Sequence, residues 1–257
     1  MIRSASLLSA DEALAKVPQV TLQFWLIKIT ATTLGETGSD AVSMSMGLGY
    51  LLGTAIFGLV FALAVYAQIQ ARKFHPFLYW FTIIASTTVG TTLADFADRS
   101  LGIGYAGGSS LLLVLLLGSL FAWHRSMGSI AVETVAEPKA EMFYWLTIMC
   151  SQTLGTALGD WVADTAGLGY TGGMLIFGGL LAITAALYFW TGMSRTLLFW
   201  VAFILTRPLG AVLGDFLDKP VVNGGLALSR YSASLVLLVA IIGMILVFKQ
   251  RAATRPH

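Results

Sequence analysis

Charged residues are scarce in this chain of 257 residues: they make up 11% of it, whereas hydrophobic residues make up 57%. Soluble domains carry about 25% charged residues. This shortage, together with long apolar runs, predicts an integral membrane protein whose partner is the lipid bilayer. The net charge of +2 gives no reason to expect a nucleic-acid partner.

Cysteine and histidine are almost absent. Cys150 is the only cysteine, which excludes an intrachain disulfide and a thiolate metal site. His75 and His124 fall at the ends of predicted helices and His257 is the last residue, so a bis-histidine haem site is not expected. We expect no cofactor. Because Ser–His and His-Glu-x-x-His patterns are also missing, we do not expect an enzyme. The first 20 residues lack the pattern of a cleavable signal peptide.

The chain contains a fourfold internal repeat. Each copy has an aromatic residue followed by Trp, then nine residues and Gly, then four residues and Asp. The copies are Trp25-Gly35-Asp40, Trp80-Gly90-Asp95, Trp145-Gly155-Asp160 and Trp200-Gly210-Asp215. The tryptophans are 55, 65 and 55 residues apart, which indicates two successive duplications.

Eight apolar segments are predicted as membrane helices, because each is close to the ~20 residues that a span needs. They lie near 20–40, 48–70, 77–96, 104–124, 142–161, 168–191, 196–216 and 230–249. We expect one transmembrane domain at 20–250, made of repeats 20–73, 74–126, 141–193 and 194–250 with a cytoplasmic loop at 127–140. A cytosolic segment at 1–19 would precede it and a cytosolic tail at 251–257 would follow. Ser9 and Glu12 have capping-box spacing, which predicts a short helix that ends at Pro18.

The Lys and Arg residues of the predicted loops indicate the orientation, because they gather on one side by ten to three. The ten are Arg3, Lys16, Arg72, Lys73, Arg125, Lys139, Arg195, Lys249, Arg251 and Arg255, and the three are Arg99, Lys219 and Arg230. Both termini are therefore expected in the cytoplasm. A two-helix hairpin returns the chain to its starting side, so the four repeats share one orientation, unlike inverted repeats. We expect an all-α fold with a pseudo-fourfold axis along the membrane normal.

Several repeated residues have simple packing interpretations. The tryptophans begin the first helix of each repeat, where an interfacial aromatic belt is expected. Three second helices open with Gly-x-Gly-Tyr, and their second glycines, Gly49, Gly104 and Gly169, start GxxxG patterns. We expect these glycines at close helix contacts. The fourth repeat instead has about six extra residues, from Lys219 to Gly225, and Arg230 replaces the glycine.

The repeated aspartates fall near the ends of the first helices, where a carboxylate opposes the helix dipole. An ionised group within lipid costs several kcal/mol, so these positions need hydrogen bonds, cationic partners, protonation or a bound cation. In a purely structural alternative, each Asp bonds backbone amides or Tyr hydroxyls and fixes its hairpin.

The helix faces that end at these aspartates differ between the repeats. Residues four apart share a face, and the four faces are Lys28-Thr32-Glu36-Asp40, Ile83-Thr87-Thr91-Asp95, Ile148-Gln152-Thr156-Asp160 and Phe203-Arg207-Ala211-Asp215. Lys28, Glu36 and Arg207 have no counterpart and are not expected to face lipid. Internal salt bridges, Lys28–Glu36 and Arg207–Asp215, are the structural alternative to a functional site.

At these residues the chain resembles a family of multi-pass inner-membrane proteins of bacteria that are described only as uncharacterised. The resemblance covers about residues 18–250, and its most specific part is the stretch from Lys28 to Asp40. It implies a bacterial inner-membrane location and no particular activity.

Two functions follow from the pattern. The first is a transporter or channel for an inorganic cation or a proton, with a divalent metal favoured because carboxylate oxygens suit hard cations. Its expected ion site is Glu36, Asp40, Asp95, Asp160 and Asp215, with Glu36 and Asp40 as metal ligands. The expected charge-tuning or lining residues are Lys28, Thr32, Thr87, Gln152 and Arg207. The alternative is a membrane scaffold or subunit that binds a partner through its small-residue helix faces, and a homo-oligomer fits either function.

Overall fold

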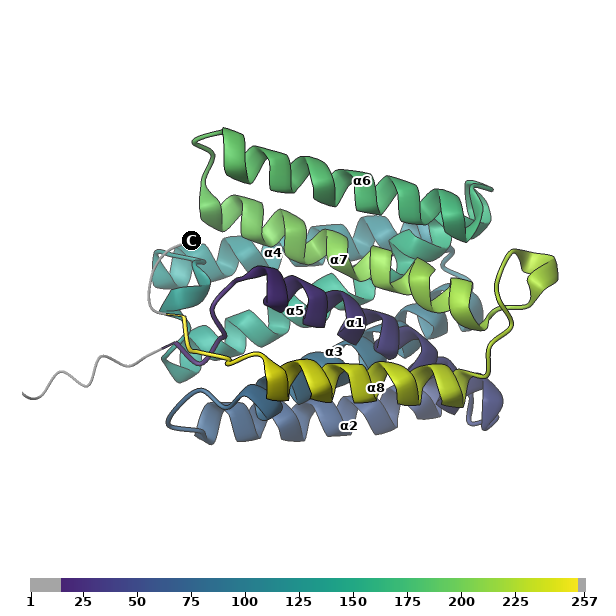
Figure 1. Cartoon of the computed structure of the whole chain (residues 1–257), viewed down its shortest axis with the longest axis horizontal. Helices are drawn as coiled ribbons and strands as arrows, with labels where there is room; N and C mark the ends of the chain where they lie inside the picture. Colours follow the sequence, from purple (N-terminus) through teal and green to yellow (C-terminus); the bar gives the residue numbers. More distant parts are fainter. Residues whose placement is uncertain (1–14, 254–257) are drawn as a thin grey trace, which may run out of the picture.

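The structure, a computed structural model, describes residues 15–253 and is all-α over that range. Its eight α-helices confirm the predicted segments to within a few residues, although α4 and α5 extend into the expected loop (Figure 1). They are α1 (Leu22–Asp40), α2 (Gly49–Gln70), α3 (Pro76–Asp95), α4 (Tyr105–Met127), α5 (Pro138–Asp160), α6 (Gly169–Trp190), α7 (Arg195–Asp218) and α8 (Arg230–Val247). The helix predicted around Ser9 and Glu12 lies outside the described residues.

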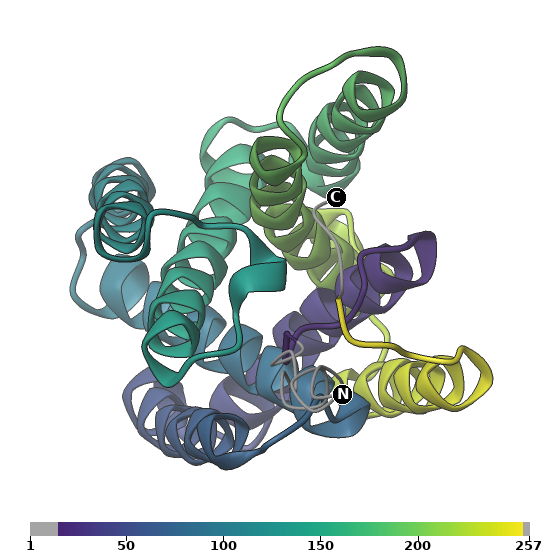
Figure 2. The same cartoon turned by 90° about the vertical axis from the view of Figure 1, so that its left-hand side faces the viewer.

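The four odd-numbered helices form the core of the molecule. They carry the Trp-Gly-Asp motif and pack side by side in the ring α1–α3–α5–α7, with α7 returning to α1 (Figure 2). All four run in the same direction, so the arrangement fits the expected parallel repeats. We call α1, α3, α5 and α7 the inner helices.

The even-numbered helices lie outside this ring, and each packs mainly on the inner helix of the next repeat. Thus α2 packs on α3, α4 on α5, α6 on α7, and α8 on α1. Each repeat is a pair of helices, as predicted, but these two helices pack mainly on neighbouring repeats and make few contacts with each other. In the first three repeats a five-residue π-helical turn separates them: Ala41–Ser45, Phe96–Ser100 and Trp161–Thr165.

The glycines of the motif set the spacing of the inner helices. A Cβ atom at each would overlap a side chain of the next inner helix in the ring, always at the same level. The pairs are Gly35 with Thr87, Gly90 with Gln152, Gly155 with Arg207 and Gly210 with Thr32. Helix backbones approach this closely only where one partner lacks a side chain. The last pair closes the ring between α7 and α1.

The other repeated glycines correct our expectation about GxxxG contacts. Gly49, Gly104 and Gly169 have φ of +74°, +76° and +64° and no neighbouring atom within 4 Å of an added Cβ. They make the left-handed turn that starts the outer helix, a conformation that glycine adopts without steric cost. Only the second glycine of each pattern, Gly53, Gly108 or Gly173, packs closely against a neighbouring segment.

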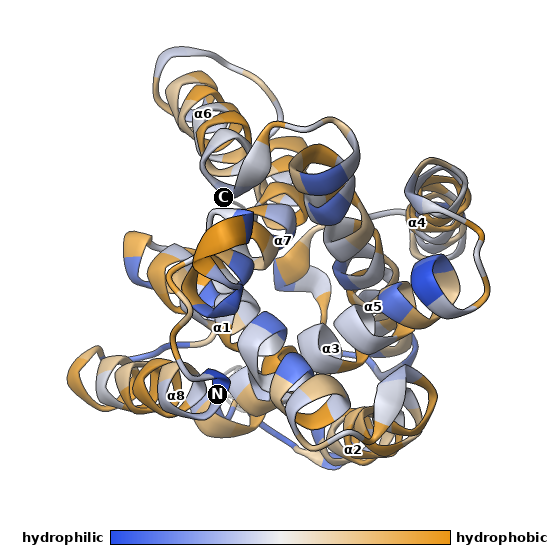
Figure 3. Ribbon diagram, turned by 90° about the vertical axis from the view of Figure 1, so that its right-hand side faces the viewer, coloured by the Kyte–Doolittle hydropathy of each residue, from blue (hydrophilic) through white to orange (hydrophobic). Residues whose placement is uncertain are grey.

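Six of the eight helices in the described range are long and apolar enough to cross a membrane. The exceptions are α1 and α5, which are inner helices and carry polar side chains into the ring rather than toward lipid. The outer helices are mostly exposed and apolar (Figure 3), whereas α3 and α7 are mostly buried. This arrangement is that of a multi-pass membrane protein, whose polar groups must be satisfied inside the bundle.

Aromatic residues fill one end of the ring, and the expected aromatic belt is mostly wrong. Of the four motif tryptophans, Trp80, Trp145 and Trp200 are at most 3% exposed, and Trp25 is partly exposed. The loop before α5 covers this end, with Val132 and Val135 buried and the Ile130 carbonyl accepting a hydrogen bond from Trp200 Nε1 at 2.9 Å. These side chains are core residues because loop and terminal segments fold over them.

The two ends of the described chain meet at this same end. Pro18 and Ala252 form an isolated antiparallel bridge, and the Gln19 N–H donates to the Arg251 carbonyl at 2.8 Å. Lys16 adds a salt bridge to Glu141 at the start of α5, at 2.6 Å. An even number of spans is expected to bring both termini to one face in this way.

Candidate functional site

Five layers of side chains follow the axis of the inner ring, one residue from each inner helix per layer. Every one of these side chains is at most 5% exposed. In order from the aromatic end, the layers are Phe24/Tyr79/Tyr144/Phe199, Lys28/Ile83/Ile148/Phe203, Thr32/Thr87/Gln152/Arg207, Glu36/Thr91/Thr156/Ala211 and Asp40/Asp95/Asp160/Asp215. The i, i+4 spacing produces this stacking because it returns to the same helix face. The predicted lining residues and the predicted acids therefore all face the axis.

Two cations bridge the four aspartates of the last layer. Arg99 contacts Asp95 at 2.8 Å and Asp160 at 3.1 Å. Lys219 contacts Asp40 at 2.5 Å and Asp215 at 3.1 Å. Each cation follows one Asp by four residues and reaches the Asp of the next repeat, so the two bridges are related by a pseudo-twofold axis.

This pairing corrects the sequence analysis in two respects. The Arg207–Asp215 pair of the structural alternative does not form: Lys219 pairs with Asp215, and Arg207 pairs with Glu36. Arg99 and Lys219, which were assigned to loops, belong to the site. A signal for them was present, since both stand four residues after the repeated Asp, where the sister repeats have Met44 and Asp164.

The extra residues of the fourth repeat hold Lys219 in place. They fold back on the end of α7: the Leu226 N–H donates to the Phe216 carbonyl at 2.7 Å, and the Leu228 N–H donates to the Leu217 carbonyl at 2.9 Å. Burial lowers the pKa of Lys219, but the neighbouring carboxylates, Asp215 first, outweigh it and raise that pKa above its ordinary value. The ammonium therefore stays charged over the aspartates.

Glu36 is paired one layer deeper. Its Oε2 lies 3.0 Å from Nη2 of Arg207, and Thr91 donates to the same oxygen at 3.4 Å. Arg207 also donates to the hydroxyls of Thr91 and Thr156. The Lys28–Glu36 pair of the structural alternative therefore does not form. Residues eight apart on one helix are about 12 Å apart along its axis, and the partner of Glu36 comes from a neighbouring helix.

Lys28 is fully buried and has no hydrogen-bond acceptor among the described residues. Its Nζ lies 4.1 Å from the centroid of the Phe203 ring, an arrangement that stabilises a cation through the ring quadrupole. Nε and Nη1 of Arg207 likewise lack acceptors within residues 15–253. The middle of the axis thus holds two basic side chains whose N–H groups are only partly hydrogen-bonded.

Three carboxylates converge between the fourth and fifth layers. One oxygen each from Glu36, Asp40 and Asp215 lies within 4.8 Å of the other two. Because Ca²⁺ binds oxygens at about 2.3–2.6 Å, oxygens at this spacing can all contact one cation. The structure brings the predicted ligands Glu36 and Asp40 together and adds Asp215. It leaves Asp95 and Asp160 on the Arg99 side of the axis.

A comparison with protein families gives the same fourfold division. The family model described as Repeat of Unknown Function (DUF347) matches residues 23–74, 78–129, 143–194 and 198–252. No curated protein and no solved structure matches the chain. Each matched range holds one inner helix followed by one outer helix, so the family repeat has the same order as the repeat defined by the Trp-Gly-Asp motif. The chain belongs to the Repeat of Unknown Function (DUF347) family and contains four copies of its repeat.

Proposed function

We propose that the protein is a transporter of a small inorganic cation, with a divalent metal as its substrate, in the inner membrane of a bacterium. The observation that carries the proposal is the convergence of Glu36, Asp40 and Asp215 inside a membrane bundle. Burying three carboxylates together is unfavourable without positive charge between them. Hard cations prefer such oxygen ligands.

The charges of this cluster favour a divalent ion. Three carboxylates face two close cationic partners, Arg207 and Lys219. Arg230 lies 3.8 Å from Asp40, but its charge is offset by Asp218, which it contacts at 2.8 Å. Lys219 contacts the carboxylates that a metal would bind, and it lies at the accessible outer end. If a divalent cation displaces Lys219 while Arg207 stays in place, the three negative charges are neutralised. A monovalent cation in the same position would leave one negative charge uncompensated.

The buried axis favours a transporter with alternating access over an open channel. The aromatic layer fills one end, where the Tyr79 and Tyr144 hydroxyls lie 2.6 Å apart. Arg99 and Lys219 cover the other end. An ion that enters from the Lys219 side would be held at Glu36, Asp40 and Asp215 until the aromatic end opened.

Metal flux into vesicles tests this function. Purified protein in liposomes that enclose a metal-sensitive dye is expected to carry at least one ion from a panel of Mg²⁺, Ca²⁺, Mn²⁺, Co²⁺, Ni²⁺ and Zn²⁺ faster than empty liposomes do. Asp215→Asn should reduce that flux because it removes a ligand, whereas Asp164→Asn, at an exposed position, should not. Flux at the empty-liposome level for every ion would contradict the proposal.

The alternative, a scaffold that binds a partner through small-residue faces, has less support. Gly49, Gly104 and Gly169 lie in turns, and Gly53, Gly108 and Gly173 are already packed within the chain. The motifs that suggested a docking face are therefore used internally.

Both termini are proposed to lie in the cytoplasm, because Lys and Arg favour that side by ten to three. A phosphatase reporter at the C-terminus should be inactive, and the same reporter inserted at Asn223 should be active. A fluorescent-protein reporter should give the reverse pattern. If both positions reported the same side, the topology would be wrong.

A further inference from the structure

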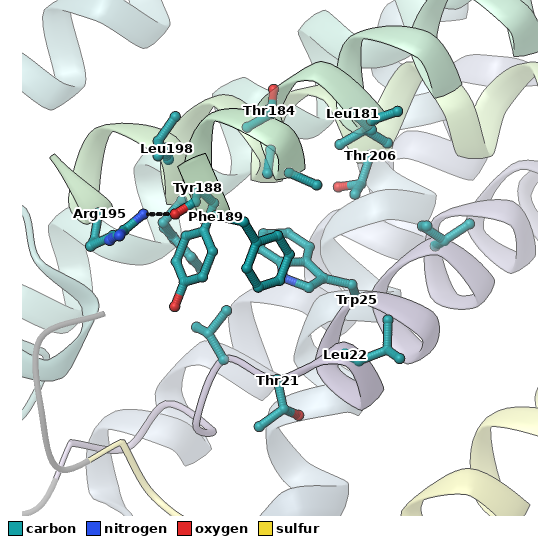
Figure 4. A pocket seen from close by; sticks show the side chains of 16 residues that line it. Thr21, Leu22, Trp25, Leu181, Thr184, Tyr188, Phe189, Arg195, Leu198 and Thr206 are labelled. Atoms are coloured by element: carbon teal, nitrogen blue, oxygen red, sulfur yellow. Dashed lines mark hydrogen bonds between the residues drawn. The ribbon is translucent and has the colours of Figure 1, made fainter. Parts of the chain in front are cut away.

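An apolar groove runs along the outside of the bundle where the ring closes. It lies between α1, α6 and α7 on the half of the molecule near the aromatic end, and its volume is about 580 Å³ (Figure 4). Trp25 and Ile29 form one wall, Leu181 and Ala185 the other, and Ala202 lies between them on α7. This volume falls in the range of about 300–1,000 Å³ that small-molecule sites occupy.

The length of the groove matches one leaflet of a bilayer. Its lining on α7 extends from Arg195, the first residue of the helix, to Thr206. Eleven residues of α-helix rise about 16 Å, which is close to half of the ~30 Å hydrocarbon core. A single acyl chain of the leaflet at this end of the bundle is long enough to fill it.

The mouth of the groove carries a positive charge. The Arg195 guanidinium stacks over the Tyr188 ring at 4.2 Å and donates to the Tyr188 carbonyl. A guanidinium has five N–H donors, so most of them remain able to bind phosphate oxygens. The charge stands where the helices emerge from the apolar region, at the level of a lipid headgroup.

Within residues 15–253, the first repeat differs from the others in leaving its motif tryptophan partly uncovered at this groove. The tryptophan of the motif is buried in the second, third and fourth repeats but partly exposed in the first, where Trp25 lines the groove. Trp200 by comparison is covered by Trp123 and by the loop that holds Ile130. The partly exposed Trp25 therefore leaves an apolar surface that a lipid chain could cover.

We propose that the groove binds one anionic phospholipid, with its acyl chain against Trp25 and Ala202 and its phosphate at Arg195. The acyl chain ends at Thr206, the last lining residue on α7. The Thr206 carbonyl accepts a hydrogen bond from the Thr32 hydroxyl of α1 at 3.2 Å. The bound lipid therefore stabilises the contact between α1 and α7 next to Arg207. This proposal does not depend on cation transport.

Lipid retention by the purified protein tests the site. In native mass spectrometry from detergent, dioleoyl phosphatidylglycerol is expected to remain bound in a one-to-one complex and to raise the melting temperature more than dioleoyl phosphatidylcholine does. Ala202→Trp, which fills the groove, should remove the one-to-one complex. Arg195→Gln should leave the groove able to hold a chain but remove the preference for phosphatidylglycerol, by tenfold or more in relative retention.

Two matched variants serve as controls. Ala55→Trp adds the same side chain at an exposed position of α2, and Arg72→Gln removes an exposed charge from a loop at the same end. Both should retain phosphatidylglycerol like the parent. Equal retention of the two lipids by the parent, or an unchanged complex in Ala202→Trp, would overturn the proposal. Loss of retention in Ala55→Trp to the same degree would also do so, because the binding would then be non-specific.

Discussion

Replacing Glu36 with glutamine is expected to reduce metal flux to the level of empty liposomes. The change keeps the shape of the side chain but removes one of the three charges that face the proposed ion. It also leaves the Arg207 guanidinium buried without its carboxylate. Breaking a buried ion pair by removing one partner costs about 3–5 kcal/mol, so the variant should also melt at a lower temperature.

A second variant separates these two effects. In Glu36→Gln combined with Arg207→Met, neither charge of the pair remains, and replacing a buried pair with apolar groups is often neutral for stability. The double variant should therefore recover most of the lost melting temperature and still carry no metal. Glu137→Gln, at an exposed position before α5, should behave like the parent. Parental flux in Glu36→Gln would reject Glu36 as a ligand.

Replacing Gly210 with leucine should have the largest effect on folding. A Cβ there would overlap the Thr32 side chain and lie 2.8 Å from the Thr32 carbonyl carbon, which is backbone and cannot rotate away. The inner helices α7 and α1 would have to separate. Overpacking usually costs about 1–3 kcal/mol and sometimes more. We expect little folded protein in size-exclusion chromatography, or a clearly lower melting temperature in what remains.

Gly178→Leu is the matched control. Gly178 also lies within a long helix, α6, but an added Cβ would meet no atom within 4 Å. Because leucine favours the helix over glycine by somewhat under ~1 kcal/mol, this variant should be as stable as the parent or slightly more so. If the two leucine variants melted alike, close packing at the motif glycines would not be what holds the ring together.

The sequence predicted the helices and the repeat well because both depend on local patterns. Apolar runs give spans, and the recurrence of Trp80, Gly90 and Asp95 does not depend on the tertiary fold. The packing between repeats was not predicted, for the opposite reason. The contacts of α2 with α3 and of Gly35 with Thr87 join different repeats, and no local pattern reports a contact 52 residues away, such as that of Gly35 with Thr87.

The candidate site was predicted in its composition but not in its pairing. The four-residue spacing correctly placed Glu36, Asp40 and Asp215 on faces that meet. Their cationic partners were missed because charge pairs between helices depend on the order of the ring. Arg207 reaches Glu36 only because α7 lies beside α1, although the two residues are 171 positions apart.

The packing of each outer helix on the following repeat has a consequence for biosynthesis. A repeat that has just entered the membrane cannot complete its own packing, because α2 must wait for α3 and α4 for α5. The first helix waits longest, since its cover is α8, the last helix to be made. Contacts between such distant parts of a chain slow folding. The nascent protein therefore keeps the axis-facing polar groups of α1 unpaired until α7 closes the ring, and the outside of α1 stays uncovered until the last span, α8, is inserted.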